Sequence, residues 1–398
     1  MRISVRGLSM PASPIRRLIP YANKAKEKGI SVYHLNIGDP DVPTPKVILK
    51  AIKGFKQKVL PYGPSEGLKE LREAISDYFG DYGIDVEPDN VFITTGGSEA
   101  IFFVLSAICD PGDEVIIPEP FYTNYNGFAN MAGVKIKPLT LSVENGFHLP
   151  PKDDIKHLIT DKTRAILICS PNNPTGTVYS REEIQSIIDL ALEYDLWVLS
   201  DEVYREFVFD GKKHTSVLEF KEAAERTVVM DSISKRFSCC GARIGFIVTR
   251  NRELWSTLLK FGQARLCPPT IEQMGAIAGF KHWKEFMPGI IDEYRLRRDV
   301  VFEEIENIDG AFTLKPEGAF YTVVKLPVNN AEEFIKWMLT EFNINGKTTM
   351  LAPASGFYAT EGTGLDEARI AYVLNQDKLR DAMNILREGL KVYAGNKG

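Results

Sequence analysis

Seven short runs of apolar residues recur through the middle of the chain, each bounded by turn-forming residues. They span residues 91–95, 114–118, 134–137, 165–169, 196–200, 227–231 and 245–249. Runs of this length are typical of strands buried on both faces. Several are separated by helical spacing, as in residues 182–194, which follow the helix-capping residue Ser180. This alternation predicts an open α/β sheet covered by helices.

The two ends of the chain have a different pattern. Residues 14–28 have helix-like spacing and lead into a stretch rich in glycine and proline that begins at residue 36. Residues 284–305 predict a long charged helix, followed by short strands over 312–314 and 319–324 and by further helices. We therefore expect a large α/β domain over residues 48–285 and a smaller α/β domain built from residues 1–47 and 286–398.

Composition narrows the class of protein. The chain has 398 residues, of which 25% are charged and 44% hydrophobic, values typical of a soluble globular protein. Its net charge of -5 argues against a broad nucleic-acid-binding surface. No apolar run approaches the roughly 20 residues that span a bilayer, and the N-terminal residues lack a signal-peptide pattern. The five cysteines have no metal-binding spacing, so we expect reduced thiols, as in a cytoplasmic protein. From the charge and the lack of a long apolar run, we expect neither nucleic-acid nor membrane partners.

The segment around Lys235 has the most specific chemistry. It contains Ser232 and Ser234 before the lysine and Arg243 eight residues after it. A lysine forms a Schiff base with a carbonyl compound, and hydroxyls together with an arginine bind phosphate. The segment therefore predicts a lysine that holds pyridoxal 5'-phosphate (PLP), an aldehyde that carries a phosphate. The serine and lysine also match the Ser-x-x-Lys motif of penicillin-binding enzymes, but residues 200–202 and 347–349 lack that motif's companion elements.

Two further motifs begin where predicted strands end, the edge at which open α/β sheets bind ligands. Gly97, Ser98 and Glu99 open a helix whose free N–H groups suit a phosphate, although an ordinary strand-to-helix turn has the same pattern. Asp201 ends an apolar strand, where a carboxylate needs a cation or hydrogen-bond donors. A protonated pyridine nitrogen would supply that cation, and a helix N-cap is the alternative. Tyr204 could donate to the phenolic oxygen of the same cofactor.

Four other residues have weaker signals. Asn173 lies in a turn-rich segment after a strand and could contact both the phenolic oxygen and a substrate carboxylate. Tyr122 could stack on a flat heterocycle or fill the rim of the core. Arg369 lies in a strand-like run, which favours a carboxylate ligand, with a structural salt bridge as the alternative. Tyr62 lies in a turn before a helix expected over residues 68–79, where a tyrosine usually has no function.

Together these motifs resemble those of class I and II aminotransferases, the fold-type-I PLP enzymes, over nearly the whole chain. The resemblance rests on the order and spacing of Ser-Pro-Asn-Asn-Pro-Thr-Gly at 170–176, Asp-x-x-Tyr at 201–204 and Ser-x-Ser-Lys at 232–235. Supporting matches are Ile-Gly-Asp-Pro-Asp at 37–41, Tyr-Gly-Pro-Ser-Glu-Gly at 62–67 and Pro-Glu-Gly-Ala-Phe-Tyr at 316–321. The aspartate aminotransferase branch is the most similar, and the resemblance implies a mainly parallel, seven-stranded sheet in the large domain.

The resemblance implies a role in cofactor binding for most candidate residues. Lys235 would form the Schiff base with PLP, and Asp201 would pair with the pyridine nitrogen. The remaining contacts to the cofactor would come from Tyr204 and Asn173 at the phenolic oxygen, Tyr122 stacked on the ring, and Gly97, Ser98, Ser232 and Arg243 at the phosphate, with Ser234 or the Glu99 backbone nearby. Tyr62 would reach the phosphate of the neighbouring subunit, which implies a homodimer with shared active sites.

The resemblance also implies a reaction, ping-pong transamination between an L-amino acid and a 2-oxo acid such as 2-oxoglutarate. Aspartate is the first expectation for the amino donor, and Arg369 would bind its α-carboxylate with Asn173 and the Gly38 backbone. Arg265 lies in a segment similar to the loop that reaches the partner's active site, so it could contact a distal carboxylate. Arg265 does not fall at the position of the arginine that recognises the substrate side chain in the family. A second departure is Ala242, where many relatives carry a tryptophan.

Other reactions stay open on the same scaffold. An aminotransferase for aromatic or other amino acids and a PLP-dependent lyase would share these motifs. A non-catalytic PLP-binding regulator is disfavoured, because such proteins usually have a DNA-binding module ahead of this region and the motifs begin by about residue 36.

Overall fold

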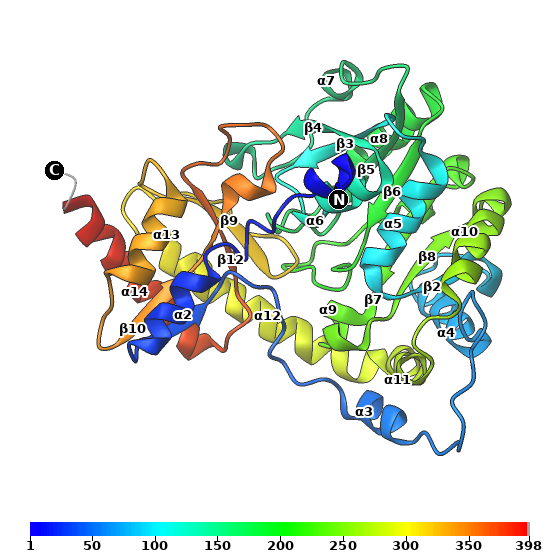
Figure 1. Ribbon diagram of the computed structural model, residues 1–398, viewed down its shortest axis with the longest axis horizontal. Helices are drawn as coiled ribbons and strands as arrows, with labels where there is room; N and C mark the ends of the chain where they lie inside the picture. Colours follow the sequence, from blue (N-terminus) through cyan, green and yellow to red (C-terminus); the bar gives the residue numbers. More distant parts are fainter. Residues whose placement is uncertain (396–398) are drawn as a thin grey trace.

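The computed structural model describes residues 1–395, and its centre is a seven-stranded sheet in the order β2-β8-β7-β6-β5-β3-β4 (Figure 1). The strands are β2 (Val91–Thr94), β3 (Glu114–Glu119), β4 (Lys135–Thr140), β5 (Thr163–Cys169), β6 (Trp197–Asp201), β7 (Thr227–Ser232) and β8 (Gly245–Thr249). Neighbouring strands are parallel except at β8, which is antiparallel to both β2 and β7. The seven predicted strands and the mainly parallel sheet are confirmed.

Both faces of the sheet are buried, as β5 illustrates. Ile166 and Ile168 pack into the core on one face, whereas Ala165 and Leu167 pack into the core on the other. Because successive side chains of a strand point to opposite faces, a strand covered on both sides needs an unbroken apolar run. The same run made this strand recognisable in the sequence.

Helices cover the two faces of the sheet (Figure 1). One core takes side chains from α5 (Gly96–Ile108), α6 (Asn124–Ala132) and α10 (Arg252–Arg265), and the other from α4 (Lys69–Gly80), α8 (Arg181–Glu193), α11 (Thr270–Lys281) and α12 (Trp283–Glu306). The predicted start of α8 is confirmed by a capping box, in which Ser180 Oγ accepts from Glu183 N at 3.2 Å and the Glu183 carboxylate accepts from Ser180 N at 2.7 Å. The shorter helices are α1 (Val5–Leu8), α3 (Lys46–Lys53), α7 (Lys152–Lys156) and α9 (Ile233–Arg236).

Segments from both ends of the chain meet beside the large sheet (Figure 1). β1 (Ser31–His34) pairs in parallel with β10 (Lys347–Met350). A three-stranded antiparallel sheet contains β11 (Ala352–Pro353), β12 (Glu367–Ala371) and β9 (Tyr321–Lys325). The helices in contact with these strands are α2 (Ile19–Glu27), α13 (Ala331–Thr340) and α14 (Gln376–Gly395). The pairing of β1 with β10 agrees with a unit built from both termini, whose boundaries near residues 47 and 285 stay predictions.

Two expectations about local structure were wrong. Residues 312–314 do not form a strand: Phe312 makes one isolated bridge with Lys325, and both Phe312 and Leu314 are exposed, so no second layer covers the run. The helix-like stretch over 14–28 is helical only from Ile19, because turns precede it. Within residues 1–395, no helix combines the length and apolar character that crossing a bilayer requires.

Candidate active site

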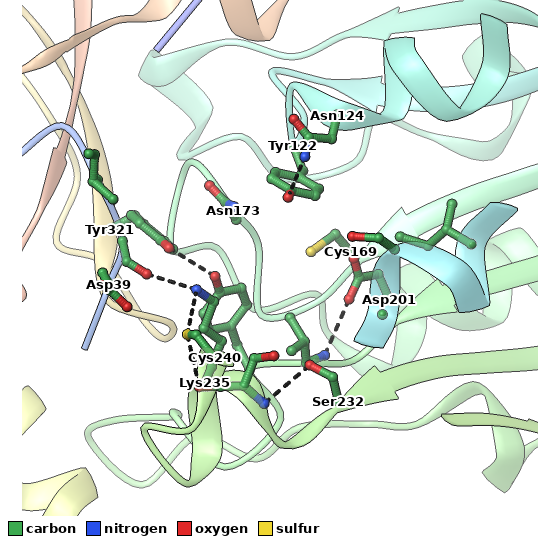
Figure 2. Close-up of a pocket in the computed structure, with 18 of the residues that line it drawn as sticks. Asp39, Tyr122, Asn124, Cys169, Asn173, Asp201, Ser232, Lys235, Cys240 and Tyr321 are labelled. Carbon is green, nitrogen blue, oxygen red and sulfur yellow. Dashed lines mark hydrogen bonds between the residues drawn. The ribbon is translucent and has the colours of Figure 1, made fainter. Parts of the chain in front are cut away.

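A cavity of about 550 Å³ lies where the carboxyl ends of several central strands meet. β5, β6 and β7 end at this cavity with Cys169, Asp201 and Ser232 (Figure 2). This is the edge at which an open α/β sheet binds ligands. The predicted site residues that line the cavity are Gly38, Gly97, Ser98, Tyr122, Asn173, Asp201, Tyr204, Ser232, Ser234, Lys235, Arg243 and Arg369.

Lys235 lies in the short helix α9, which starts where β7 ends. Ser232 caps this helix by accepting from Ser234 N at 3.3 Å. The Lys235 amine donates to Gly38 O at 2.8 Å and to Cys240 Sγ at 3.6 Å. No carboxylate within the described residues forms an ion pair with it. The amine therefore faces the cavity without a partner of opposite charge (Figure 2).

Asp201 is a buried carboxylate at the end of β6, with 8% of its surface exposed. Tyr125 Oη donates to its Oδ2 at 2.8 Å and Val203 N to its Oδ1 at 3.3 Å. Residues 1–395 place no cation against it. Burial therefore raises its pKa to about 6. No helix follows β6, so the N-cap alternative is wrong, and the carboxylate is an ionisable group in the cavity wall that lacks a cation.

Arg369 is the opposite case, a buried cation with only 2% of its surface exposed. Its Nη1 donates to Asn173 Oδ1 at 2.9 Å and its Nη2 to Asn36 O at 2.6 Å, while its buried Nε has no partner. The rings of Tyr321 and Phe357 lie 4.6 and 4.8 Å from its guanidinium carbon. No carboxylate of the described chain pairs with it, which rules out the structural salt bridge. Burial without a counter-ion lowers the pKa of the guanidinium.

The start of α5 and Arg243 together form a cradle of hydrogen-bond donors. Gly96 has a φ of +76°, and a Cβ there would collide with Arg243 Nη2. The glycine thus lets the guanidinium lie directly against the helix start, where backbone N–H groups are free. Gly97 and Ser98 line the cavity from the same helix. A helix N-terminus beside a guanidinium suits a phosphate group.

Hydrogen bonds hold the hydroxyls of three tyrosines that line the cavity. Tyr204 and Tyr321 share a hydrogen bond of 2.9 Å between their hydroxyls. The Tyr122 hydroxyl accepts from Asn124 Nδ2 at 2.8 Å (Figure 2), and burial raises the pKa of Tyr122 to about 12. A Cβ on Gly38 would collide with the Tyr321 hydroxyl, so only glycine lets the backbone at this position reach the ring.

The family model for aminotransferases of class I and II matches residues 30–386. The chain belongs to this family. It is 33% identical to an aspartate aminotransferase of Pyrococcus horikoshii, over 98% of this chain and 97% of that protein. It is also 33% identical to a (5-formylfuran-3-yl)methyl phosphate transaminase of Methanocaldococcus jannaschii, over 98% of this chain and 99% of that protein. A solved structure of an alanine aminotransferase from Pyrococcus furiosus superposes with a TM-score of 0.90, with 32% identity and coverage of 98% of this chain and 100% of that one.

The protein is therefore an aminotransferase with the fold-type-I architecture, and the resemblance seen in the sequence is confirmed. The similar proteins carry different substrate names, among them aspartate, aromatic amino acids and alanine. The family and the names of the similar proteins support a transaminase, and the substrate has to be inferred from the site.

Three predicted site residues do not line this aminotransferase's cavity. Glu99 accepts from Thr95 N at 2.7 Å and forms an ion pair with Arg265 Nη1 at 3.1 Å. Arg265 also donates to Ser65 O at 3.0 Å. Its guanidinium therefore ties α10 to the start of α5, whereas its role at a distal carboxylate concerns a partner's active site and stays a prediction. Tyr62 is 78% exposed and stays a prediction that depends on a neighbouring subunit.

Several residues of the site were missed in the sequence. Tyr125 donates to Asp201, Tyr321 joins Tyr204 to Arg369, and Cys240 accepts from Lys235. Each contact except the last joins residues more than 40 positions apart, so no local pattern could reveal it. Tyr321 did lie in the Pro-Glu-Gly-Ala-Phe-Tyr match, which was the one available signal.

Proposed function

We propose that this aminotransferase binds PLP and moves an amino group between an L-amino acid, aspartate first, and a 2-oxo acid such as 2-oxoglutarate. One observation carries the proposal: Asp201 and Arg369 are both buried, have opposite charges and line one cavity with Lys235, and neither has a counter-ion in the described chain. Burying a charge without a partner is costly. A ligand with a cationic ring nitrogen and a carboxylate would supply both missing charges.

The residues around Lys235 fit PLP group by group. The cradle of Gly97, Ser98 and Arg243 suits the phosphate. Asp201 suits the ring nitrogen, because a cation there would stabilise the buried carboxylate and lower its pKa from about 6. Further contacts are proposed for Tyr122 at the ring face, Asn173 and Tyr204 at the phenolic oxygen, and Ser232, Ser234 and the Glu99 backbone near the phosphate.

The chemistry that PLP supplies when bound is a carbonyl for amine exchange and a ring that accepts electrons from the substrate. Lys235 would hold that carbonyl until the substrate amine takes its place. Gly38 O and Cys240 Sγ accept from Lys235 Nζ, and from this position the amine would move a proton from the substrate's α-carbon to the cofactor. Asp201 would keep the ring nitrogen protonated, which would stabilise the negative charge that develops when the α-proton leaves.

Substrate orientation is assigned to Arg369 and Asn173. The two side chains are already hydrogen-bonded to each other, and the unpaired Nε leaves the guanidinium with a free donor. A planar guanidinium binds a carboxylate through two parallel hydrogen bonds. Gly38 would contribute backbone contacts beside them. Holding the α-carboxylate here fixes which bond of the α-carbon faces the lysine.

A cytoplasmic homodimer with shared active sites belongs to the same proposal. All five cysteines are free, which suits a reducing compartment. Tyr62 lies beside the exposed apolar residues Val59 and Leu60. An exposed apolar group of this kind is typical of a protein interface. Pairing of two subunits at this surface would bring Tyr62 towards the phosphate of the second subunit.

A panel of amino donors with 2-oxoglutarate tests this function. The PLP-loaded protein should form glutamate and the donor's 2-oxo acid in equal amounts, with aspartate among the best donors. Release of ammonia or carbon dioxide without glutamate would instead support a PLP-dependent lyase and overturn the proposed reaction.

A further inference from the structure

Four cationic side chains line the cavity, namely Arg16, Lys235, Arg243 and Arg369. The proposed function uses three of them: Arg243 for the phosphate, Lys235 for the carbonyl and Arg369 for the α-carboxylate. Arg16 has no role in that scheme. It lies in the segment before α2, together with Ser13 and Ile15, which also line the cavity.

The backbone of Arg16 is held in place while its side chain is free. Arg16 N donates to Ser13 O at 3.2 Å, and Arg16 O accepts from Ile19 N at 3.0 Å at the start of α2. Next to it, Leu18 is buried in the core. The Arg16 side chain is exposed and forms no ion pair or hydrogen bond with any residue of 1–395. Arg17, by contrast, forms an ion pair with Glu332 and does not line the cavity.

Packing places this segment near Arg369. Pro14 lies directly against Gly356, where a Cβ would collide with the proline ring. The next residue, Phe357, has its ring 4.8 Å from the Arg369 guanidinium carbon. Arg16 therefore enters the cavity from the side at which the α-carboxylate is proposed to bind. Asp39, also in the cavity wall, interacts with Cys240 beside Lys235 and forms no ion pair with Arg16 within residues 1–395.

We propose that Arg16 binds the side-chain carboxylate of a substrate whose α-carboxylate is held by Arg369. This inference rests on the proposed function and narrows it to dicarboxylic amino acids and dicarboxylic 2-oxo acids. A guanidinium without a partner at the edge of a cavity is suited to a second carboxylate, because it offers paired donors and is always charged. Arg16 would select the substrate side chain from within the same chain, whereas the role expected of Arg265 depends on a partner subunit.

The test compares Arg16→Gln with Arg17→Gln, a neighbouring arginine outside the cavity. With aspartate as donor, Arg16→Gln should lower kcat/KM roughly 10- to 100-fold, the scale of one lost charged hydrogen-bonding partner. With alanine as donor, the same variant should stay within about twofold of the wild type. Arg17→Gln should leave both donors unchanged, and Arg16→Lys should recover part of the loss with aspartate.

A binding measurement separates this inference from the proposed function. Succinate, a dicarboxylate that cannot react, should bind the PLP-loaded wild type more tightly than propionate in calorimetry, and Arg16→Gln should remove that difference. If the wild type transaminates no donor, the proposed function fails, while the succinate comparison still decides the role of Arg16. Equal losses with aspartate and alanine, or an unchanged preference for succinate, would overturn the role of Arg16.

Discussion

Replacing Asp201 with asparagine should stabilise the cofactor-free protein at neutral pH. Burial raises the pKa of Asp201 to about 6 from an ordinary 3.8, so ionising the carboxyl destabilises the fold by about 3 kcal/mol above pH 6. Asparagine keeps the shape and has no charge. Its single oxygen can accept from Tyr125 or from Val203 N, one bond fewer than Asp201 accepts, which costs about 1 kcal/mol. The expected net gain is about 1–2 kcal/mol.

The sign of the pH dependence follows from the direction of the pKa shift. The folded state binds the Asp201 proton more tightly than the unfolded chain, so the wild type loses this stability as the pH rises from about 4 to about 6. Urea unfolding of the cofactor-free proteins should therefore find the variant more stable at pH 7 to 8, with the advantage disappearing near pH 4. With PLP bound, the order should reverse, because only the aspartate gains a cationic partner.

Glu202 provides a matched control one residue away. Like Asp201 it is buried, but unlike Asp201 it has a basic partner. Its Oε2 lies 3.0 Å from His214 Nε2, and its Oε1 accepts from Ser216 Oγ at 2.9 Å. Glu202→Gln should therefore destabilise the protein at pH 7. If Asp201→Asn also destabilised the cofactor-free protein, equally at every pH, the carboxylate would be an ordinary structural group and our reasoning about its missing cation would be wrong.

Three further predictions follow from the site and from one surface cluster. Lys235→Ala should abolish the visible absorption band of the PLP-loaded protein and its turnover, with an unchanged circular dichroism spectrum; near-normal turnover would refute the role of this lysine. Arg369→Gln should lower kcat/KM for every amino donor roughly 100- to 1,000-fold, the loss expected for a charged bidentate contact, while titration finds the same affinity for PLP; equal kcat/KM would contradict our assignment. Hydrogen bonds to Glu183 and Glu317 raise the pKa of His148 to about 9. His148→Gln should therefore be less stable than the wild type below about pH 6.5, and thermal melts should find the difference shrinking as the pH rises through about 9; a constant difference would exclude a charged histidine.

The large sheet could be predicted because its sequence signal is local. A strand covered on both faces needs an apolar run, and β5 has one from Ala165 to Cys169. The strand expected over 312–314 failed because its apolar residues are exposed. Nothing in three residues distinguishes a buried strand from an extended surface segment.

The candidate site was predictable as far as its residues lie next to recognisable motifs. Asp201 and Lys235 follow apolar runs, so their position at the sheet edge followed from the fold. The partners of these residues could not be predicted. The ion pair of Arg265 with Glu99 depends on how α10 packs against α5, and the place of Arg16 in the cavity wall depends on Pro14 packing against Gly356.

A single-turnover reaction tests the central claim most directly. The PLP-loaded protein, mixed with L-aspartate and no oxo acid, should form one oxaloacetate per active site and then stop, because the amino group stays on the cofactor. Adding 2-oxoglutarate should release one glutamate per site and restore the original absorption spectrum. Continuous release of ammonia or carbon dioxide, or no change of spectrum with any amino donor, would contradict the account.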